Sequence, residues 1–393
     1  MASSSSSFPT SWQITLVTLT ILISSLLSSS ISASAAATKQ NPALPFKKIY
    51  AFGDSFTDTG NTRSISGPSG FGHVSNAPYG ITYFHRPTNR YSDGRLVIDF
   101  VAESLSLPYL QPYRAVSSNA TADSTHGVNF AVAGSAGSTA IEHEFFVKNN
   151  LSLDITPQSI LTQLLWFNKF LQSKGCKVGG PRCKFDDALF WVGEIGVNDY
   201  AYTLGSDVPG DTIQKLGISR VTSFLQALLK KGAKYVVVQG LPLSGCLPLS
   251  MTLAPEDDRD RIGCVKSVNH QTYSHNLVLQ AKLHELRTQF PHAVIAYADY
   301  WNAYLTVMKS PSQYGFTERF KACCGSGDPY NFDVSATCGA PSATVCKSPS
   351  QYINWDGVHL TEAMYKVLSD TFLKGNATHP PFSYLLDRKL RNG

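Results

Sequence analysis

The sequence predicts an α/β sandwich in which helices cover a central, mainly parallel sheet of five strands. Five short runs of mostly apolar, β-branched or aromatic residues recur along the chain. Amphipathic segments lie between these runs, and no internal repeat or interdomain linker interrupts the alternation. Continuous apolar runs are typical of strands buried on both faces, and such strands alternate with helices in parallel sheets.

The strands and helices follow from these two patterns. The predicted strands are residues 49–52, 128–132, 188–192, 235–239 and 293–297. Apolar residues three and four positions apart predict helices over residues 159–171, 211–231, 266–290 and 361–373. We expect Asp211 to cap the second of these helices, Gly232 to end it, and Thr361 to open the last one.

Two segments have neither pattern. Residues 60–80 are rich in Gly, Ser and Pro, and predict a long surface loop. Residues 325–350 predict a second irregular region, which nearby cysteines would hold together.

The N-terminal segment has the composition of a secretory signal peptide. The first 38 residues carry no charge, and an apolar run over 14–27 precedes small residues with a cleavage site near Ala35. A signal anchor is the alternative, but a spanning helix needs roughly 20 apolar residues and this run is shorter. We therefore expect a signal peptide over 1–35 and one secreted domain over 45–385, with no membrane span in the mature chain.

The eight cysteines and three glycosylation motifs agree with secretion. An even cysteine set in a secreted chain indicates disulfides. Local pairs are plausible for Cys176 with Cys183 and for Cys246 with Cys264, and the other four would pair among themselves. Zinc is disfavoured because no C-x2-C pair occurs. The Asn-x-Ser/Thr motifs, each expected on an exposed loop, begin at Asn119, Asn150 and Asn376.

Composition excludes other classes of protein. The apolar fraction of 43% and the charged fraction of 16% are those of a soluble globular protein. The formal net charge of +5 is small for 393 residues, and no basic stripe favours a nucleic-acid partner. The sequence Glu142-His143-Glu144 does not match the H-E-x-x-H motif, so neither a metal site nor a cofactor is expected.

The first candidate for chemistry is Ser55, which follows the first predicted strand in the sequence Gly53-Asp54-Ser55. Open α/β sheets bind ligands at the carboxyl ends of their strands. A serine hydroxyl needs a base and an orienting acid before it can attack a carbonyl. Taken alone, this triplet could equally be an ordinary turn, in which Asp and Ser bond their own backbone.

The second candidate pair is Asp356 and His359, which precede the last predicted helix. An aspartate and a histidine three residues apart can converge where Gly357 allows a turn, and the imidazole could then take the serine proton. Spacing favours this pair only modestly, and a loop aspartate beside a helix-cap histidine is the alternative. The other histidines weighed for the same role are His73, His85, His126, His143 and His270.

Oxyanion donors are candidates on two further loops. Gly134 follows the second predicted strand and could offer a backbone N–H, whereas Asn198 follows the third and could offer a side-chain amide. Asp58 and Asn61 are expected to brace the serine loop, and Asp199 to brace Asn198. The aromatic residues that could line an acyl pocket or belong to the core are Tyr79, Tyr83, Phe84 and Phe145.

The order of these blocks resembles that of the GDSL, or SGNH, hydrolase family, and in particular its plant GDSL esterase/lipase branch. The resemblance covers nearly all of the chain after the signal peptide and includes further matches at 88–95, 99–100 and 321–325. It implies a three-layer α/β/α sandwich of the flavodoxin-like type. Phe56 departs from the family pattern, which has leucine there, and we expect altered packing with little change in chemistry.

The resemblance also implies the roles of the site residues. Ser55 would be the nucleophile, His359 the base and Asp356 its orienting acid. The oxyanion donors would be the backbone N–H of Ser55, Gly134 and Asn198. The implied activity is hydrolysis of a small-molecule lipid, acetyl or phenylpropanoid ester. Two alternatives are an acyltransferase that moves a hydroxycinnamoyl group to an alcohol, and a catalytically silent binding or defence protein.

Overall fold

The computed structural model describes residues 45–66, 71–119, 121–137, 158–176, 184–203 and 206–392. These residues belong to one compact unit that begins at Pro45. The predicted signal peptide lies outside the described residues. Among the described residues, no helix combines the length and the apolar character needed to cross a bilayer.

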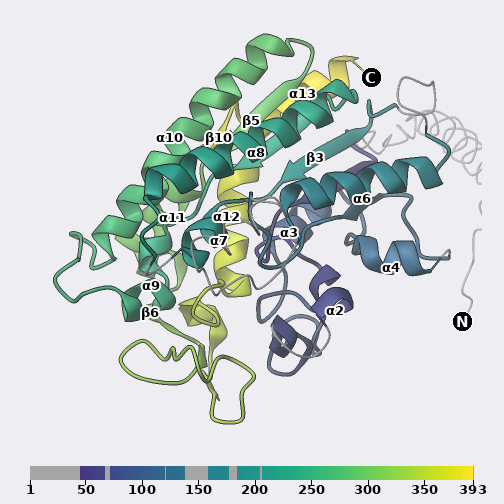
Figure 1. The fold of residues 1–393 in the computed structure, drawn as a ribbon. Helices are drawn as coiled ribbons and strands as arrows, with labels where there is room; N and C mark the ends of the chain where they lie inside the picture. The colour runs from purple at the N-terminus through teal and green to yellow at the C-terminus, as the bar shows by residue number, and fades with distance from the viewer. Residues whose placement is uncertain are drawn as a thin grey trace, which may run out of the picture. The chain divides into compact units, whose positions relative to one another are not determined.

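A six-stranded sheet forms the centre of the unit, with strand order β10-β5-β4-β3-β1-β2 (Figure 1). Five strands pair in parallel, and only β10 is antiparallel. The strands are β1 (Lys48–Phe52), β2 (Gly127–Asn129), β3 (Ala188–Val192), β4 (Tyr235–Gln239), β5 (Val294–Ala298) and β10 (Thr378–His379). All five predicted strands are therefore present, and the two-residue edge strand β10 is an addition that has no apolar run.

Alternate residues of each strand face opposite helix layers, which makes the unit a three-layer sandwich. In β3, Leu189 and Trp191 join one core cluster, whereas Phe190 and Val192 join the other. The first cluster includes α3 (Val97–Ser104), α11 (Tyr300–Lys309), α12 (Glu362–Leu373) and α13 (Phe382–Asn392). The second includes α6 (Ile160–Ser173), α8 (Gly210–Lys230) and α10 (Lys266–Gln289), and Figure 1 shows these three lying across one face.

Most predicted helix boundaries agree with the observed ones. The Ser159 side chain caps α6, and the Thr361 hydroxyl accepts a hydrogen bond from Met364 N at the start of α12. Asp211 does not cap α8, because the helix begins one residue earlier and Asp211 lies in its first turn after Pro209. A carboxylate in the first turn still interacts favourably with the helix dipole.

The segment predicted as a long surface loop contains helical turns and buried residues. It includes α2 (Asn61–Ser66) and the 3-10 helix η1 (Phe71–Ser75), and the Asn61 and Thr62 side chains are buried. Gly and Ser content does not reveal this, because the burial arises from contacts with distant segments. The remaining short helices are α4 (Tyr113–Ser118), α7 (Val197–Tyr202), α9 (Pro248–Leu253), η2 (Ser244–Cys246), η3 (Pro311–Tyr314) and η4 (Pro349–Gln351).

Disulfides hold the irregular region after residue 322. Cys323 is bonded to Cys346 and Cys324 to Cys338, so the last four cysteines pair among themselves. Cys246 is bonded to Cys264 as predicted, whereas Cys183 lies outside the described residues. The short strands of the region are β6 (Glu318–Ala322), β7 (Cys324–Gly325), β8 (Thr344–Val345) and β9 (Tyr352–Asn354).

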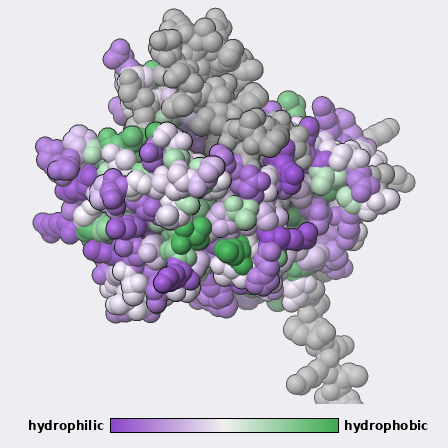
Figure 2. All heavy atoms as spheres, turned by 90° about the horizontal axis from the view of Figure 1, so that it is seen from below, coloured by the Kyte–Doolittle hydropathy of each residue, from purple (hydrophilic) through white to green (hydrophobic). Residues whose placement is uncertain are grey.

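The strand order places a topological switch point between β1 and β3. The chain passes from β1 to β2 on one side and then to β3 on the other side of β1. Loops diverge at such a point, and ligands bind outside the carboxyl ends of the strands there. On the face seen in Figure 2, most described residues are hydrophilic, and the strongly hydrophobic ones gather in small separate groups.

Candidate active site

Ser55 lies on a tight turn directly after β1. The backbone N–H groups of Thr57 and Asp58 both donate to Asp54 O, which closes the turn around the serine. The loops after β1 and β3 meet closely here, because a Cβ on Gly193 would collide with the Thr57 hydroxyl. This close approach requires glycine at position 193 and brings the β3 loop beside the serine.

Asp356 and His359 share a tight loop that returns the chain to α12. Trp355 N donates to His359 O at 2.7 Å, and Asp356 Oδ1 accepts from the backbone N–H of both Val358 and His359. Gly357 has a φ of 96°, and a Cβ there would collide with the ring of Phe332. Glycine is therefore required on both conformational and steric grounds.

The structure brings Ser55, His359 and Asp356 into one hydrogen-bonded chain. His359 Nε2 lies 2.7 Å from Ser55 Oγ, and His359 Nδ1 lies 2.8 Å from Asp356 Oδ2. The three side chains are almost fully buried. Burial by itself would raise the pKa of Asp356, but the charge of His359 and hydrogen bonds from its ring and backbone lower it to about 2. The carboxylate is therefore ionised at neutral pH.

Two predicted oxyanion donors are available in the structure. Among the described residues, no acceptor takes a hydrogen bond from the backbone N–H of Ser55 or Gly134. Asn198 differs, because its Nδ2 donates to Asp54 Oδ2 at 2.7 Å and to Ser135 O at 3.1 Å. The Asn198 side-chain amide therefore joins the loop after β3 to the loops after β1 and β2.

Four further buried side chains, to which the sequence motifs assign no catalytic role, surround these groups. Tyr79 OH donates to Asp356 Oδ2 at 2.8 Å, and the Tyr91 ring lies 4.6 Å from the His359 ring. Gln163 bonds both backbone groups of Gly53 and also the Ser135 hydroxyl. Glu194 lies two residues beyond β3. From the sequence, Tyr79 could line an acyl pocket or belong to the core, and no sequence spacing links it to Asp356.

The predicted bracing residues act on more than one loop. Asp58 accepts from the backbone N–H of Gly60, Asn61 and Ala133, so it ties the serine loop to the loop after β2. Asn61 Nδ2 donates to Asn129 O and Ala131 O. These two predictions are confirmed. The Asp199 carboxylate accepts from Gly137 N, which lies on the loop after β2.

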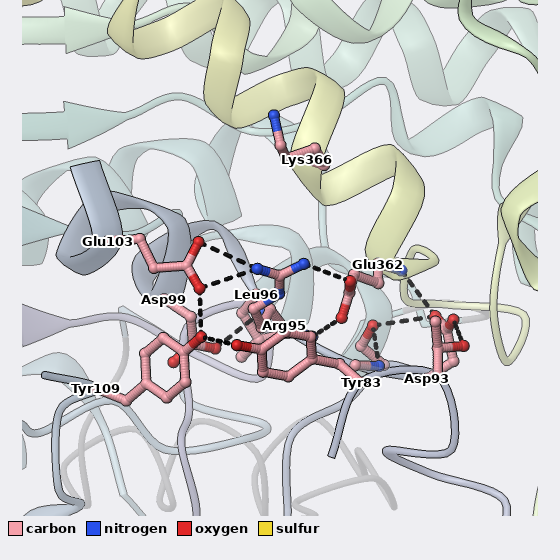
Figure 3. A network of polar contacts seen from close by, with 12 residues as sticks. Tyr83, Asp93, Arg95, Leu96, Asp99, Glu103, Tyr109, Glu362 and Lys366 are labelled. Atoms are coloured by element: carbon pink, nitrogen blue, oxygen red, sulfur yellow. Dashed lines mark hydrogen bonds and ion pairs between the residues drawn. The ribbon is translucent and has the colours of Figure 1, made fainter. Parts of the chain in front are cut away.

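A polar network fixes the start of α12, three residues after His359. Asp93 Oδ1 accepts from Glu362 N at 2.7 Å, at the first residue of the helix. Figure 3 shows the Arg95 guanidinium pointing between Glu103 of α3 and Glu362 of α12, and both ion pairs are short. The network therefore joins the loop before α3 to the helix that follows the candidate base.

Several other candidates lie away from this chain of residues. His73, His85 and His270 are exposed, whereas His143 and Phe145 lie outside the described residues.

Phe56, in the place of the family leucine, is buried with its ring 5.2 Å from that of His359. Tyr83 is 40% exposed and stacks on Arg95 at the surface. Within the described ranges, no group of three or more His, Cys, Asp or Glu side chains could hold a metal ion.

Comparisons with known proteins agree with the family resemblance. The family model described as GDSL-like lipase/acylhydrolase matches residues 49–372. A GDSL esterase/lipase of Arabidopsis thaliana is 63% identical over 378 residues, which cover 95% of this chain and 97% of the relative. Acetylajmalan esterase 2 of Rauvolfia serpentina is 39% identical, over 84% of this chain and 91% of the relative.

Solved structures give more distant matches. A variant of an acetyl xylan esterase from Geobacillus stearothermophilus is 13% identical and superposes with a TM-score of 0.34. The match covers 84% of this chain and 94% of that chain.

Proposed function

Since the chain belongs to the GDSL-like lipase/acylhydrolase family, as a plant GDSL esterase/lipase, it is a carboxylic ester hydrolase, and we propose that Ser55 is its nucleophile. The observation that carries this proposal is the hydrogen-bonded chain from Ser55 through His359 to Asp356. An alcohol, an imidazole and an ionised carboxylate in this order are the parts that nucleophilic acyl transfer requires.

In the proposed mechanism, His359 Nε2 takes the hydroxyl proton as Ser55 Oγ attacks the ester carbonyl carbon. The Asp356 carboxylate stabilises the imidazolium that forms. The backbone N–H of Ser55, the N–H of Gly134 and the amide of Asn198 stabilise the oxyanion. Collapse of the tetrahedral intermediate expels the alcohol, which takes the proton from His359. Water then attacks the acyl-enzyme with His359 as base and releases the acid.

We propose a small-molecule acetyl ester as the substrate class. A relative with 39% identity carries the name acetylajmalan esterase 2, which supports a short acyl group over a lipid or phenylpropanoid one. A hydroxycinnamoyl transfer would use the same acyl-enzyme with an alcohol in place of water, so the acceptor decides between hydrolysis and transfer.

We also propose that the chain enters the secretory pathway through residues 1–35 and that residues 45–385 are its catalytic domain. Three described disulfides support an oxidising compartment. Asn119 and Asn376 are exposed, as glycosylation requires, and the Asn119 side chain already bonds the Thr121 hydroxyl of its own motif. Asn150 lies outside the described residues and is proposed on its sequence motif alone.

Turnover of a panel of esters tests the function. The full glycosylated protein is assayed with acetyl, long-chain acyl and hydroxycinnamoyl esters, each with and without an alcohol acceptor. We expect acetyl esters to give the highest kcat/KM and free acid as the main product. Ser55→Ala should lose at least about a thousandfold in kcat, because no nucleophile remains. Wild-type turnover in Ser55→Ala would contradict the proposal, and acyl transfer to the alcohol would favour the transferase.

A further inference from the structure

A pair of buried acidic side chains lies behind the serine loop, and the mechanism above does not use it. Asp54 immediately precedes Ser55, and Glu194 follows β3. Their exposed fractions are 1% and 0%. The charge of Asp54 acts on Glu194 and, together with burial, disfavours the ionised form of its carboxyl group. Two negative charges are strongly disfavoured side by side in a buried site, so one of this pair carries a proton.

The surroundings of the pair assign that proton to Glu194. Burial and the nearby Asp54 charge raise the pKa of Glu194 well above its ordinary value. Burial also raises the pKa of Asp54, to about 6, although its hydrogen bonds with Glu194 and Phe56 N oppose this. Glu194 Oε1 is buried, and as a carboxylate oxygen it has no hydrogen-bond partner. A protonated Glu194 gains a donor, for which the Asp54 carboxylate is the neighbouring acceptor.

Asp54 in turn anchors the oxyanion amide. Its Oδ1 accepts from Phe56 N at 3.0 Å, and its Oδ2 accepts from Asn198 Nδ2 at 2.7 Å. The second hydrogen of that amide makes the longer contact, 3.1 Å to Ser135 O. An oxyanion could displace this longer contact while the shorter one holds the amide in place.

We propose that Glu194 is a positioning residue, which donates a hydrogen bond to Asp54 and thereby holds the Asn198 amide where the oxyanion forms. The proposal rests on the proposed function, since it requires an oxyanion at Ser55. Glu194 touches neither the substrate nor the reacting atoms. Its loss would therefore lower kcat and leave KM nearly unchanged, because the oxyanion forms only after binding.

The same arrangement predicts a pH dependence. When Glu194 loses its proton, two buried negative charges face each other, and the hydrogen bond that holds Asp54 is lost. The other titratable groups that influence the pair electrostatically are His359, Asp199, Tyr300 and Tyr365. Since burial raises the pKa of Glu194, this ionisation occurs on the alkaline side of its ordinary value, and activity should fall there.

Two substitutions separate positioning from packing. Glu194→Gln keeps the shape and an N–H donor for Asp54 but cannot ionise, whereas Glu194→Met keeps similar volume without a donor. We expect Glu194→Gln to retain kcat within about twofold near neutral pH. The fall in activity at higher pH that arises from ionisation of Glu194 should be absent in this variant. Glu194→Met should lower kcat by about tenfold or more with KM within about twofold, which is part of the loss seen when an oxyanion donor is removed. Glu285→Gln makes the same change of residue type on the exposed side of α10, and it should leave kcat and the pH profile unchanged.

Each outcome decides the proposal. It is overturned if Glu194→Gln keeps the wild-type pH profile and Glu194→Met keeps the wild-type kcat. If Glu194→Met fails to fold, the pH profile of Glu194→Gln still decides. Activity per site is normalised by complete titration with a serine-directed organophosphonate. If Ser55→Ala remained fully active, the proposed function itself would fail, which distinguishes that result from failure of the inference.

Discussion

At the scale of single residues, the base is held by aromatic side chains from distant parts of the chain. Phe56 and Tyr91 lie beside the His359 ring, and Tyr79 bonds its acidic partner. Burial, together with the nearby Asp356 charge, raises the pKa of Tyr79 well above its ordinary value, so its hydroxyl remains a donor. The Asp356 carboxylate therefore has a donor that stays in place throughout the reaction.

Replacement of Tyr79 by Phe should weaken the base without altering binding. The change removes one hydrogen bond to an ionised carboxylate, a bond worth about 1.5–3 kcal/mol. We expect kcat to fall by about tenfold with KM nearly constant, and the pKa of Asp356 to rise from its value of about 2. Steady-state kinetics at neutral pH measures kcat and KM, and an NMR titration of the Asp356 carboxyl group in acidic solution measures its pKa. The control is Tyr83→Phe, which removes an exposed hydroxyl, and equal losses in the two variants would contradict this role for Tyr79.

Sequence order identifies the reacting groups at this scale but not their supports. Ser55, Asp356 and His359 stand in ordered motifs, so their residue types and positions could be predicted. Tyr79, Gln163 and Glu194 carry no such motif, since their contacts join loops far apart in the sequence. The direct bond between Asn198 and Asp54 also depends on how the β1 and β3 loops meet.

At the scale of elements, ion pairs join the loop before α3 to α3 itself and, through Glu362, to α12, the helix after the base. Arg90 and Asp99 form a nearly completely buried, two-point ion pair at 2.8 Å. Asp99 also accepts from Leu96 N, which closes the start of α3. The Arg95 pairs in Figure 3 are closer to the surface and link α3 to α12.

Loss of the buried pair should be far more costly than loss of the surface pair. Asp99→Ala leaves the Arg90 guanidinium buried without its partner, and we expect a loss of about 3–5 kcal/mol in the free energy of unfolding. Glu103→Gln removes a more exposed pair and should cost about 0–1 kcal/mol. Urea unfolding followed by circular dichroism measures both values. Similar decreases in the free energy of unfolding for the two variants would contradict the expectation that the buried pair is the more important one.

The elements themselves were largely predictable, with exceptions that have physical causes. The strands β3 and β4 match their apolar runs residue for residue, because both faces of each strand are buried. The pattern overextends β2, which ends at Asn129 although the buried residues continue through Ala133. In that stretch Asp58 and Thr62 accept the hydrogen bond of Ala133 N in place of a strand partner.

At the scale of the whole molecule, the pKa values of several buried carboxyl groups shift in opposite directions. The pKa of Asp356 is lowered to about 2, whereas burial raises that of Asp54 to about 6 and raises that of Glu194 well above its ordinary value. Burial also raises the pKa of Asp58 and Asp93, despite several hydrogen bonds. The balance of these groups links stability to pH.

Stability should be highest in mildly acidic solution. Asp356 stabilises the fold above its unfolded pKa of about 3.9, and this contribution is lost as the pH falls toward 2. Asp54 and Glu194 bind protons more tightly when folded, so their contribution is lost as the pH rises through their raised pKa values. The Asp54 and Glu194 contributions begin to be lost above their unfolded pKa values of about 4, so calorimetric Tm values at pH 2, 4 and 8 should be highest near 4. A smaller decrease in Glu194→Gln between pH 4 and 8 is expected, and a Tm that rises steadily to pH 8 would contradict this balance.

The most direct measurement of the central claim is the mass of the trapped enzyme. The glycosylated protein is treated with a serine-directed organophosphonate, digested, and analysed by mass spectrometry. We predict a single adduct on Ser55, none in Ser55→Ala, and much slower labelling in His359→Ala, because the hydroxyl then lacks its base. An adduct on another serine, or equal labelling in Ser55→Ala, would contradict the account.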